Sequence, residues 1–552
     1  MLKNRRLTKE TLIWLWIAAP IFMLLFLFVF WPILNVIFRS FIGDFGGFTL
    51  SYYIEFFTTR YFHKVFWNSI FVASLTAGIT TFLGFLMAYT VTRTNAPLRN
   101  FFAAISYIPI ISPPFVIPVT LILMFGRKGL FTYYIFKTGF SIYGWYGIVL
   151  SEIFYYLPYA FIVISGVLLS IDSTLEEAAR QLGAKGFDSF RTVTFQLAKP
   201  GIIGAASMVF YLSMADFATP MMIGGNFHIL ATEAYFQVVG RGHTGFAAAI
   251  SVILLLISFS AFLLSNKALG KRSYITVTGR GEITSLIRPT KPYVKWLLFS
   301  LCMFISIFII LVYALVAFNA FVKVPWVDYS FTLEHFTFEY LDLLNSFKNS
   351  LIMASSAALA SSFIGVLTAF LVIRKKFFGK TFLDFLASSL FAVPGTVIGI
   401  GYILAFNTPP LVLTGTLLIL ILCVIFQKMP MGYLAAKAAL QQIDLSLEQA
   451  SRSLGAGIGT TFRKITLPLL SPAFIGAVMY AFIAAMCTVS AVIFLIAPGT
   501  QLIATTILEE TALAFNISRG VALSTILIGV CLVAFLILRL GTKIKGTSLI
   551  TV

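Results

Sequence analysis

Three charged side chains fall within long apolar runs, where a charge usually serves a function. They are Glu152, Asp216 and Lys428. Charges inside a membrane span are costly, and they commonly pair with each other or mark the path of an ion or solute. Lys428 could attract an anionic or chelated solute, or it could form an ion pair with Glu152. Asp216 precedes Pro220 and Gly224-Gly225, so it marks either a broken helix at an outer gate or a solvated helix end.

The sequence lacks the motifs of a hydrolytic or ATP-binding site. A phosphate-binding P-loop needs Gly, four residues and then Gly-Lys-Ser/Thr, so that backbone N–H groups cradle the phosphates. The nearest stretch is Gly379-Lys380-Thr381, but Arg374 takes the place of the first glycine. There is no Ser/His/Asp arrangement and no HExxH motif. We therefore predict that the chain is not an enzyme and binds no cofactor itself.

The cysteines and histidines do not predict a metal site. The cysteines all lie in apolar runs without metal-ligand spacing, and buried thiols usually behave as small hydrophobes. The histidines fall in expected outer loops, where they could help to capture a metal but are more commonly solvated. We predict no metal ligands among them. These residues are Cys302, Cys423, Cys487 and Cys531, and His63, His228, His243 and His335.

The composition is that of an integral membrane protein. Hydrophobic residues make up 59% of the chain and charged residues only 11%, and the mean hydropathy is +0.96. About 20 apolar residues in a helix cross a bilayer core of roughly 30 Å. We predict an all-α protein with about twelve membrane helices, since barrel strands would show a short alternation instead. The apolar runs lie near 11–40, 66–92, 101–125, 143–170, 201–221, 245–266, 294–320, 347–373, 381–406, 411–436, 472–494 and 516–538.

The net charge of +19 follows from membrane topology and does not indicate nucleic-acid binding. If both termini are cytoplasmic, 28 of the 39 Lys and Arg residues fall on the cytoplasmic side. Loops on the two sides have comparable total length, so this is the positive-inside bias that orients membrane proteins. We predict a multi-pass protein of the cell inner membrane that contacts lipid and has both termini in the cytoplasm.

A polar segment occurs twice in this apolar chain. IDSTLEEAARQLGA at 171–184 returns as IDLSLEQASRSLGA at 443–456, with nine of fourteen positions identical and an offset of 272. NSIFVAS at 68–74 also matches NSLIMAS at 349–355, and Gly84 and Arg93 match Gly365 and Arg374 at an offset of 281. Each half therefore has six predicted helices, with the polar segment between the fourth and fifth. Because both copies face the same side, the repeats are parallel.

These matches divide the chain into two halves and a linker. The first half is predicted at 1–266, with its polar helix near 172–186. A basic cytoplasmic linker follows at 267–293, and the second half is predicted at 294–552, with its polar helix near 444–458.

The polar segment is expected to form a short helix with a narrow apolar stripe. In the first copy the stripe is Leu175, Ala178, Ala179 and Leu182. Ser173 and Glu176 fit a capping box, and Gly183 permits the left-handed turn that ends a helix. Such a helix could lie in the lipid interface, but its shallow face of Ala and Ser and its occurrence in both halves favour docking into another protein.

These residues resemble the EAA loop of ABC-transporter permeases. That loop reads Glu-Ala-Ala, three residues, Gly, nine residues, then Ile-x-Leu-Pro. The first copy lacks the Leu-Pro ending, and the second lacks the leading Glu and one Ala. The matching residues are Glu177, Ala178, Ala179, Gly183 and Val193-Thr194-Phe195-Gln196 in the first copy, and Gln449, Ala450, Ser451, Gly455 and Ile465-Thr466-Leu467-Pro468 in the second.

The resemblance implies a type I ABC permease fold and a coupling role for the two polar helices. In that family the loop sits in a cleft of a separate ATPase subunit, which carries the ATP and Mg²⁺. Two ATPase copies and an extracytoplasmic solute-binding protein are the implied partners. The residues assigned to ATPase coupling are Glu176, Glu177, Ala178, Ala179 and Gly183, and Glu448, Gln449, Ala450, Ser451 and Gly455.

The fused arrangement of two halves resembles the ferric-iron permeases, and MADFATPMMIGGNF at 214–227 resembles the iron and phosphonate branch. This implies uptake of ferric iron by alternating access. Related permeases for phosphonate, sugar phosphate, thiamine, sulfate or polyamine are the alternatives.

A twelve-helix secondary transporter is the competing class, because it also repeats six helices in parallel. Its interior charged loop lies between the second and third helices of each half, whereas the loops here at 92–100 and 374–380 are short. A channel would need a repeated selectivity element, and the sequence has none.

Overall fold

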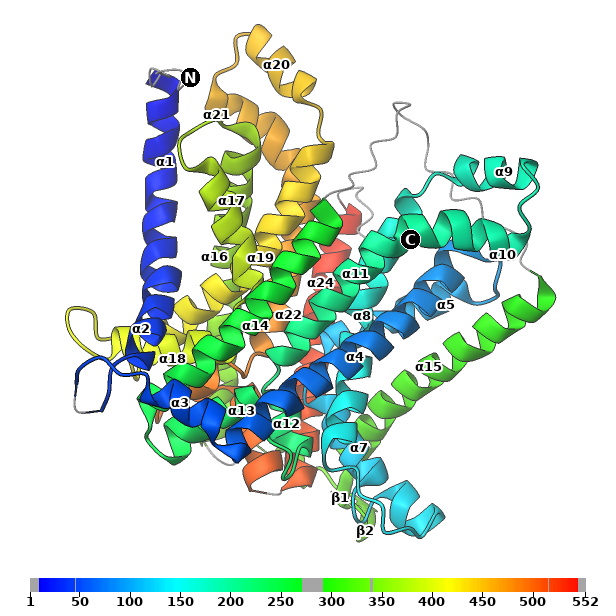
Figure 1. The fold of residues 1–552 in the computed structure, drawn as a ribbon, viewed down its shortest axis with the longest axis vertical. Coiled ribbons are helices and arrows are strands. Elements are labelled where there is room, and N and C mark those ends of the chain that lie inside the picture. Colours follow the sequence, from blue (N-terminus) through cyan, green and yellow to red (C-terminus); the bar gives the residue numbers. More distant parts are fainter. Residues whose placement is uncertain (1–8, 45, 271–290, 338–340, 515, 545–552) are drawn as a thin grey trace. The chain divides into compact units, whose positions relative to one another are not determined.

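The computed structural model describes residues 9–44, 46–270, 291–337, 341–514 and 516–544. These residues are mainly helical (Figure 1), with one short two-stranded antiparallel sheet. Most of the predicted linker at 267–293 lies outside them. The chain divides into two compact units, and each is described by itself.

The first unit combines Met1–Thr49, Phe338–Thr506 and Leu527–Thr551. It therefore joins the first predicted span to most of the second repeat. Its elements are α1 (Lys9–Leu25), η1 (Phe26–Phe30), α2 (Trp31–Ser40), α16 (Leu341–Arg374), α17 (Lys380–Ser389), η6 (Leu390–Ala392), α18 (Gly395–Phe406), α19 (Leu417–Gln442), α20 (Leu445–Ser453), α21 (Ile458–Thr461), η7 (Phe462–Thr466), α22 (Leu467–Met486), η8 (Val492–Phe494), most of α23 (Ile503–Leu508) and the later part of α24 (Ile517–Ile544).

The second unit combines Leu50–Thr337 with Ile507–Ile526, so the seventh predicted span packs with the first repeat. Its elements are α3 (Ser51–Thr58), α4 (Arg60–Arg93), α5 (Arg99–Ser106), α6 (Ile108–Ile111), α7 (Val116–Phe125), η2 (Leu130–Ile135), α8 (Trp145–Ser170), α9 (Ser173–Gln181), α10 (Gly186–Ser189), η3 (Phe190–Thr194), α11 (Phe195–Met214), α12 (Ala218–Ile223), α13 (Leu230–Tyr235), η4 (Phe236–Gly240), α14 (Thr244–Gly270), α15 (Pro292–Asn319), β1 (Val322–Val324), β2 (Asp328–Phe331), η5 (Glu334–Phe336) and η9 (Glu509–Leu513).

The prediction of about twelve membrane helices is confirmed. Among the described residues, eleven helices are long and apolar enough to cross a membrane, and one bent pair would make a twelfth. The continuous helices expected at 101–125 and 381–406 are wrong, because both segments are broken. The first divides at Ser112, and the second bends by 110° between Ala392 and Gly395. Pro113 and Pro394 stand at these breaks, where a missing N–H and a restricted preceding residue end a helix.

Repeated glycines allow the long helices to approach closely within each unit. α4 runs beside α8, and α16 runs beside α19 (Figure 1). A Cβ atom added to Gly84 would lie 2.8 Å from Cβ of Ala160, and one added to Gly365 would lie 2.7 Å from the backbone N of Tyr433. The matched glycines at an offset of 281 therefore mark the same close crossing in both repeats.

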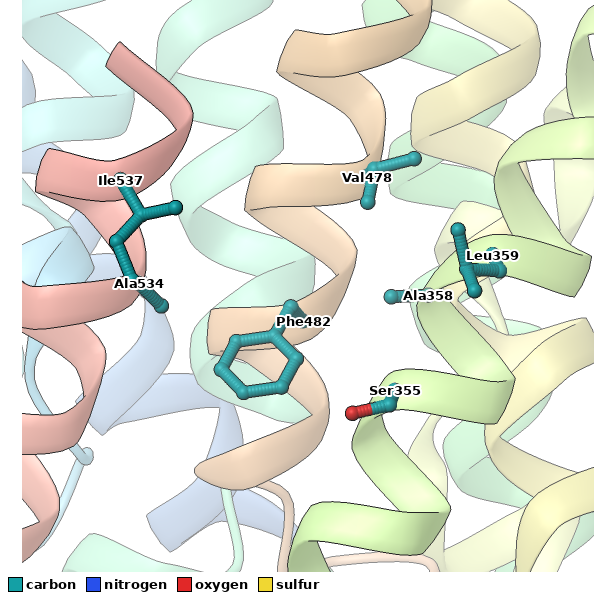
Figure 2. Close-up of a pocket in the computed structure, with 7 residues that line it drawn as sticks. All are labelled: Ser355, Ala358, Leu359, Val478, Phe482, Ala534 and Ile537. Atoms are coloured by element: carbon teal, nitrogen blue, oxygen red, sulfur yellow. The ribbon is translucent and has the colours of Figure 1, made fainter. Parts of the chain in front are cut away.

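A pocket of about 280 Å³ opens between α16, α22 and α24 in the first unit (Figure 2). Six of its seven lining side chains are apolar, so its surface suits hydrocarbon and offers nothing to hold an ionic solute. The lining residues are Ser355, Ala358, Leu359, Val478, Phe482, Ala534 and Ile537.

We predict that Gly365→Ala destabilises the protein, because the new Cβ meets backbone that no side-chain rotation can move aside. Overpacking of this kind costs about 1–3 kcal/mol, so the thermal unfolding midpoint of the purified protein should fall. Gly529→Ala is the control, since it lies within α24 with no atom within 4 Å of the new Cβ. Equal midpoints for the two variants would contradict the close crossing.

Candidate functional site

The two polar segments form α9 and α20, as the sequence predicts. Each helix ends at a glycine in the left-handed region, Gly183 with φ 92° and Gly455 with φ 83°. Beyond the turn, the Ala184 N–H donates to Ala179 O at 3.0 Å, and the Ala456 N–H donates to Ser451 O at 3.1 Å. These bonds satisfy carbonyls that would otherwise lack partners at a helix end, so both glycines end their helices in the same way.

The helix begins one residue earlier than the expected capping box allowed. Asp172 Oδ1 accepts the Thr174 backbone N–H at 2.9 Å, and Asp444 Oδ1 accepts that of Ser446 at 2.9 Å. Asp172 is therefore the capping residue, and Ser173 is the first residue of the helix. The hydrogen bond from Thr174 lowers the pKa of the Asp172 carboxyl, because it stabilises the charged form.

The apolar stripe of each polar helix is largely exposed. Leu182 is 90% exposed and Leu454 is 88% exposed, at equivalent positions. Leu175 and Leu447 are also exposed, as are Glu177, Ala178, Gln449 and Ala450, while Ala179 and Ser451 are half-buried. Each helix therefore presents a shallow, mixed surface that its own unit leaves uncovered.

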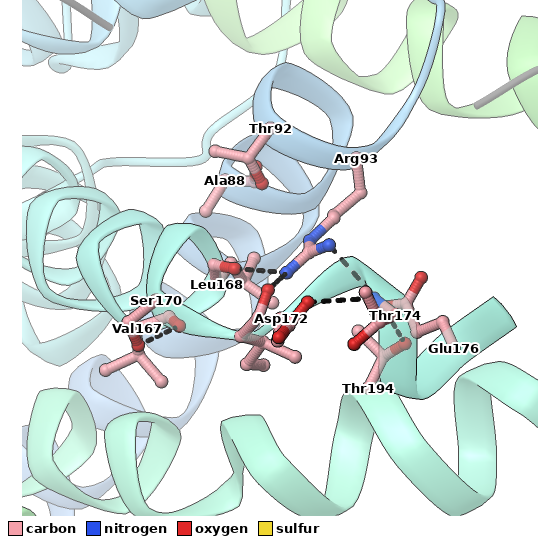
Figure 3. Close-up of polar contacts among 11 residues, drawn as sticks. Ala88, Thr92, Arg93, Val167, Leu168, Ser170, Asp172, Thr174, Glu176 and Thr194 are labelled. Carbon is pink, nitrogen blue, oxygen red and sulfur yellow. Dashed lines mark hydrogen bonds and ion pairs between the residues drawn. The ribbon is translucent and has the colours of Figure 1, made fainter. Parts of the chain in front are cut away.

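The opposite face of α9 carries a buried ion pair (Figure 3). Glu176 is 5% exposed and Arg93, the last residue of α4, is also 5% exposed. Arg93 Nη1 lies 3.6 Å from Glu176 Oε1, and Nη2 donates to the carbonyl oxygens of Leu168 and, at 2.9 Å, of Ile171. Thr194 Oγ1 donates to Glu176 Oε1 at 2.7 Å. Arg93 therefore joins three elements: the end of α4, the end of α8 and the polar helix.

The second repeat builds the same anchor from equivalent residues. Arg374 Nε, at the end of α16, lies 2.9 Å from Glu448 Oε1, and Arg374 Nη2 donates to Ile443 O at 2.8 Å. Thr466 Oγ1 completes the set with a bond of 3.4 Å to Glu448 Oε1. Each arginine, glutamate and threonine of the first anchor thus has its counterpart in the second.

A π-helical turn places each threonine. The turns η3 and η7 follow the polar helices at equivalent positions and end at Thr194 and Thr466. Each turn also packs an aromatic ring edge-to-face against a ring of the helix that carries the arginine. Tyr89 and Phe190 have ring centroids 5.3 Å apart, and Phe370 and Phe462 have theirs 4.7 Å apart. Such π turns commonly occur at functional positions.

Comparison with known proteins identifies the family. The family described as the binding-protein-dependent transport system inner membrane component matches residues 80–272 and 361–541, so each match contains one anchored polar helix. The chain belongs to this family. It is a fused, two-repeat permease subunit of a binding-protein-dependent ABC importer, and it resides in the inner membrane.

Two relatives extend the similarity over most of the permease. A putative ferric transport system permease protein of Haemophilus influenzae is 35% identical over 501 residues, which cover 87% of this chain and 78% of the relative. A ferric transport system permease protein of Actinobacillus pleuropneumoniae is 34% identical over 510 residues, covering 89% and 73%. A bacterial alginate ABC transporter of known structure is 14% identical, with a TM-score of 0.39 and coverage of 49% of this chain and 98% of that chain.

The permease also buries two acidic side chains together in the second unit. Glu152 Oε2, in α8, accepts hydrogen bonds from Thr76 Oγ1 at 2.9 Å and Ser213 Oγ at 2.5 Å. Asp216, at the break between α11 and α12, lies near enough to interact electrostatically with Glu152, and its Oδ1 faces the Thr219 N–H at 3.3 Å. Glu152 Oε1 and Asp216 Oδ2 have no hydrogen-bond partner within the described residues. Of the two alternatives for Asp216, the helix is broken there, since α11 ends at Met214 and α12 begins at Ala218, and Asp216 is buried rather than solvated. A gate at this break stays a prediction.

Lys428 lies in α19 of the first unit, two residues before the internal Pro430. Glu152 belongs to the second unit, so the pairing of Lys428 with Glu152 stays a prediction. Within the described residues, no group of three or more His, Cys, Asp or Glu side chains could hold a metal ion.

The sequence did not reveal the anchors. The sequence shows Arg93 and Arg374 as repeated basic residues at the ends of their predicted spans. It does not show which residues they pair with. Arg93 and Glu176 are distant in sequence, and only the packing of α4 on α8 brings them together. The repeated Thr194 and Thr466 were a further signal, because both stand within the matched motif.

We predict that Glu176→Gln destabilises the permease, because it removes the carboxylate charge that faces the buried Arg93 guanidinium. Removing one partner of a buried ion pair costs about 3–5 kcal/mol, so the thermal unfolding midpoint should drop clearly. Glu177→Gln is the matched control, since the neighbouring Glu177 is exposed. If both variants unfold at the wild-type temperature, the pair does not hold α9 in place.

Proposed function

We propose that this chain is the transmembrane permease of an ATP-driven ferric-iron importer. Two copies of a separate ATPase subunit dock on α9 and α20, and an extracytoplasmic binding protein delivers the solute. ATP and Mg²⁺ belong to the ATPase, and the permease itself catalyses no reaction and binds no cofactor. The ferric substrate is supported by the two relatives named for ferric transport over most of their length.

The observation that carries this proposal is the doubled docking surface. Each repeat holds its polar helix through a buried Arg–Glu pair and leaves the opposite face uncovered. Two equivalent surfaces on one chain suit two copies of the same partner. A lipid-facing helix would use bulky apolar residues along its buried side, whereas each of these stripes combines two leucines with two small residues, Ala or Ser.

Transport then follows from linkage between the docking surfaces and the membrane path. ATP binding shifts the permease between inward-facing and outward-facing states only to the extent that the ATPase pair binds one state more tightly. The polar helices must therefore face the cytoplasm, where ATP is available, and both termini lie on that side by the positive-inside bias.

Affinity purification of the tagged permease from native membranes tests the docking surfaces. We expect an ATPase at two copies per permease. Leu182→Asp and Leu454→Asp should each remove about one copy, and the double variant both, because each places a charge in an apolar contact. Val327→Asp, at an exposed apolar position between β1 and β2, should leave the stoichiometry unchanged.

Recovery of the permease without an ATPase, together with uptake driven by a proton or sodium gradient, would instead support the secondary transporter. Competition of labelled ferric-iron uptake by phosphonate, sulfate, thiamine, a sugar phosphate or a polyamine would identify one of the alternative substrates.

Uptake by Lys428→Met and Glu152→Gln tests whether these side chains line the solute path. If they do, both variants should lose uptake while they keep the wild-type thermal midpoint. Glu152→Gln is a mild change, because its amide oxygen can still accept from Thr76 and Ser213. Normal uptake with a lowered midpoint would show that the charges serve only the stability of the fold.

A further inference from the structure

The repeated Asn-Ser pair of α4 and α16 has a role that the coupling helices do not explain. Ser69 Oγ accepts the backbone N–H of Leu230, the first residue of α13, at 2.8 Å. Ser350 Oγ accepts the N–H of Ile503, the first residue of α23, also at 2.8 Å. Both hydroxyls donate to the carbonyl one turn back, to Val65 O at 3.0 Å and to Ser346 O at 2.8 Å. Each serine thus fixes the start of a distant short helix.

The short helices need this external acceptor because the residues at their own N-termini supply few side-chain hydrogen-bond acceptors. Ile229 and Leu502 precede them, and neither side chain can accept a hydrogen bond. A threonine three residues on reaches back in both cases: Thr232 Oγ1 lies 3.3 Å from Ile229 N, and Thr505 Oγ1 lies 3.3 Å from Leu502 N. The serine on the long helix satisfies the next N–H, which would otherwise be buried without a partner.

The asparagines hold the chain just before the same helices. Asn68 Nδ2 donates to His228 O at 3.0 Å, and Asn349 Nδ2 donates to Gly499 O at 2.9 Å and Gln501 O at 3.2 Å. In the first repeat α4 adds a third contact, from Tyr61 Oη to Glu233 Oε2 at 2.7 Å. We call residues 228–235 and 499–508 the outer segments, since the predicted topology places them outside.

The same two helices carry the anchors of the polar helices at their other ends. Ser69 and Arg93 are 24 residues apart in α4, and so are Ser350 and Arg374 in α16. At 1.5 Å per residue, this separates the two contacts by about 36 Å, more than the bilayer core. Neither helix contains proline, whereas α8, α11, α19 and α22, which pack against them, each have one inside.

We propose that α4 and α16 act as rigid rods that tie each outer segment to the coupling helix of the same repeat. Asn68, Ser69, Asn349 and Ser350 are the positioning residues at the outer end, and Arg93 and Arg374 are those at the inner end. A displacement of α9 or α20 is carried along an unbroken helix to the segment that faces the delivered solute. The inference rests on the proposed function for the source of that displacement.

Spin-label distances test the rod in the otherwise wild-type complex of permease and ATPase. Labels at His63→Cys in α4 and Val239→Cys in η4 sit on exposed positions beside the outer segment. We expect their distance to stay the same in the nucleotide-free and ATP-trapped complexes, because helix and segment move together. A distance that changes between the two states would overturn the proposal. Failure of the ATPase to bind at all would count against the proposed function instead.

Ser69→Ala and Ser350→Ala test whether the outer contact transmits the signal. Uptake per ATP hydrolysed should fall about tenfold in the double variant, within the usual range for coupling between sites, while basal ATP hydrolysis persists. Ser74→Ala and Ser355→Ala are matched controls, since they are exposed serines at equivalent positions on the same helices. Ser→Thr variants at 69 and 350 keep the hydroxyl and should restore coupling.

A second comparison separates transmission from stability. Thr466 bonds to Glu448, the anchor partner of Arg374 at the inner end of the rod, so this bond lies in series with the outer contact of Ser350. Ser350→Ala combined with Thr466→Val should therefore uncouple no more than the worse single variant. Losses that multiply would show independent effects and overturn the rod. A lowered thermal midpoint with normal uptake per ATP would show that the serines serve only the fold.

Discussion

A buried guanidinium must be surrounded by acceptors, and this requirement organises the end of each repeat that carries the polar helix. Arg93 donates to carbonyl oxygens at the end of α8 and forms an ion pair with a carboxylate of α9. Arg374 makes the equivalent contacts with α19 and α20. Neither arginine could be satisfied by its own helix. The long helix, the fourth span and the polar helix are therefore held in one arrangement, and the exposed stripe of the polar helix takes its direction from that arrangement.

Features governed by local chemistry could be predicted from the sequence. The exposed stripe follows from helical spacing, and the ends of α9 and α20 follow from Gly183 and Gly455, where only a residue that tolerates positive φ fits. Contacts between distant segments could not be predicted. Neither Ser69 with Leu230 nor Arg93 with Glu176 leaves a local pattern, because each pair depends on how the spans pack. The broken third spans were misjudged because hydropathy ignores the stop imposed by Pro113 and Pro394.

The two copies of the polar helix diverge mainly where the structure leaves them exposed. Glu176 and Glu448 are buried and identical, while the exposed Glu177 is replaced by Gln449. The half-buried Ala179 becomes Ser451, whose hydroxyl lies 2.9 Å from Thr461 Oγ1 and so joins α20 to α21. The buried face is constrained by the anchor and cannot vary without leaving a charge unpaired. On the exposed stripe, Leu175, Ala178 and Leu182 recur as Leu447, Ala450 and Leu454. The two proposed docking surfaces are therefore alike there and differ at Ala179/Ser451 and at the neighbouring Glu177/Gln449.

The two repeats make the same kinds of contact at both ends of the long helices. Their residues differ in the middle of the spans. The Asn-Ser contacts and the Arg–Glu anchors occur twice, with matched distances at the outer ends. The acidic cluster occurs once: at the repeat offsets, Thr76, Glu152, Ser213 and Asp216 correspond to Ala357, Val424, Ala485 and Thr488. Lys428 likewise corresponds to Tyr156. Two identical ATPase subunits, as proposed, would require matched contacts at the ends that carry the polar helices. The middle of the spans has no such requirement, so one repeat can bury acidic side chains and the other a lysine, which two identical subunits could not do.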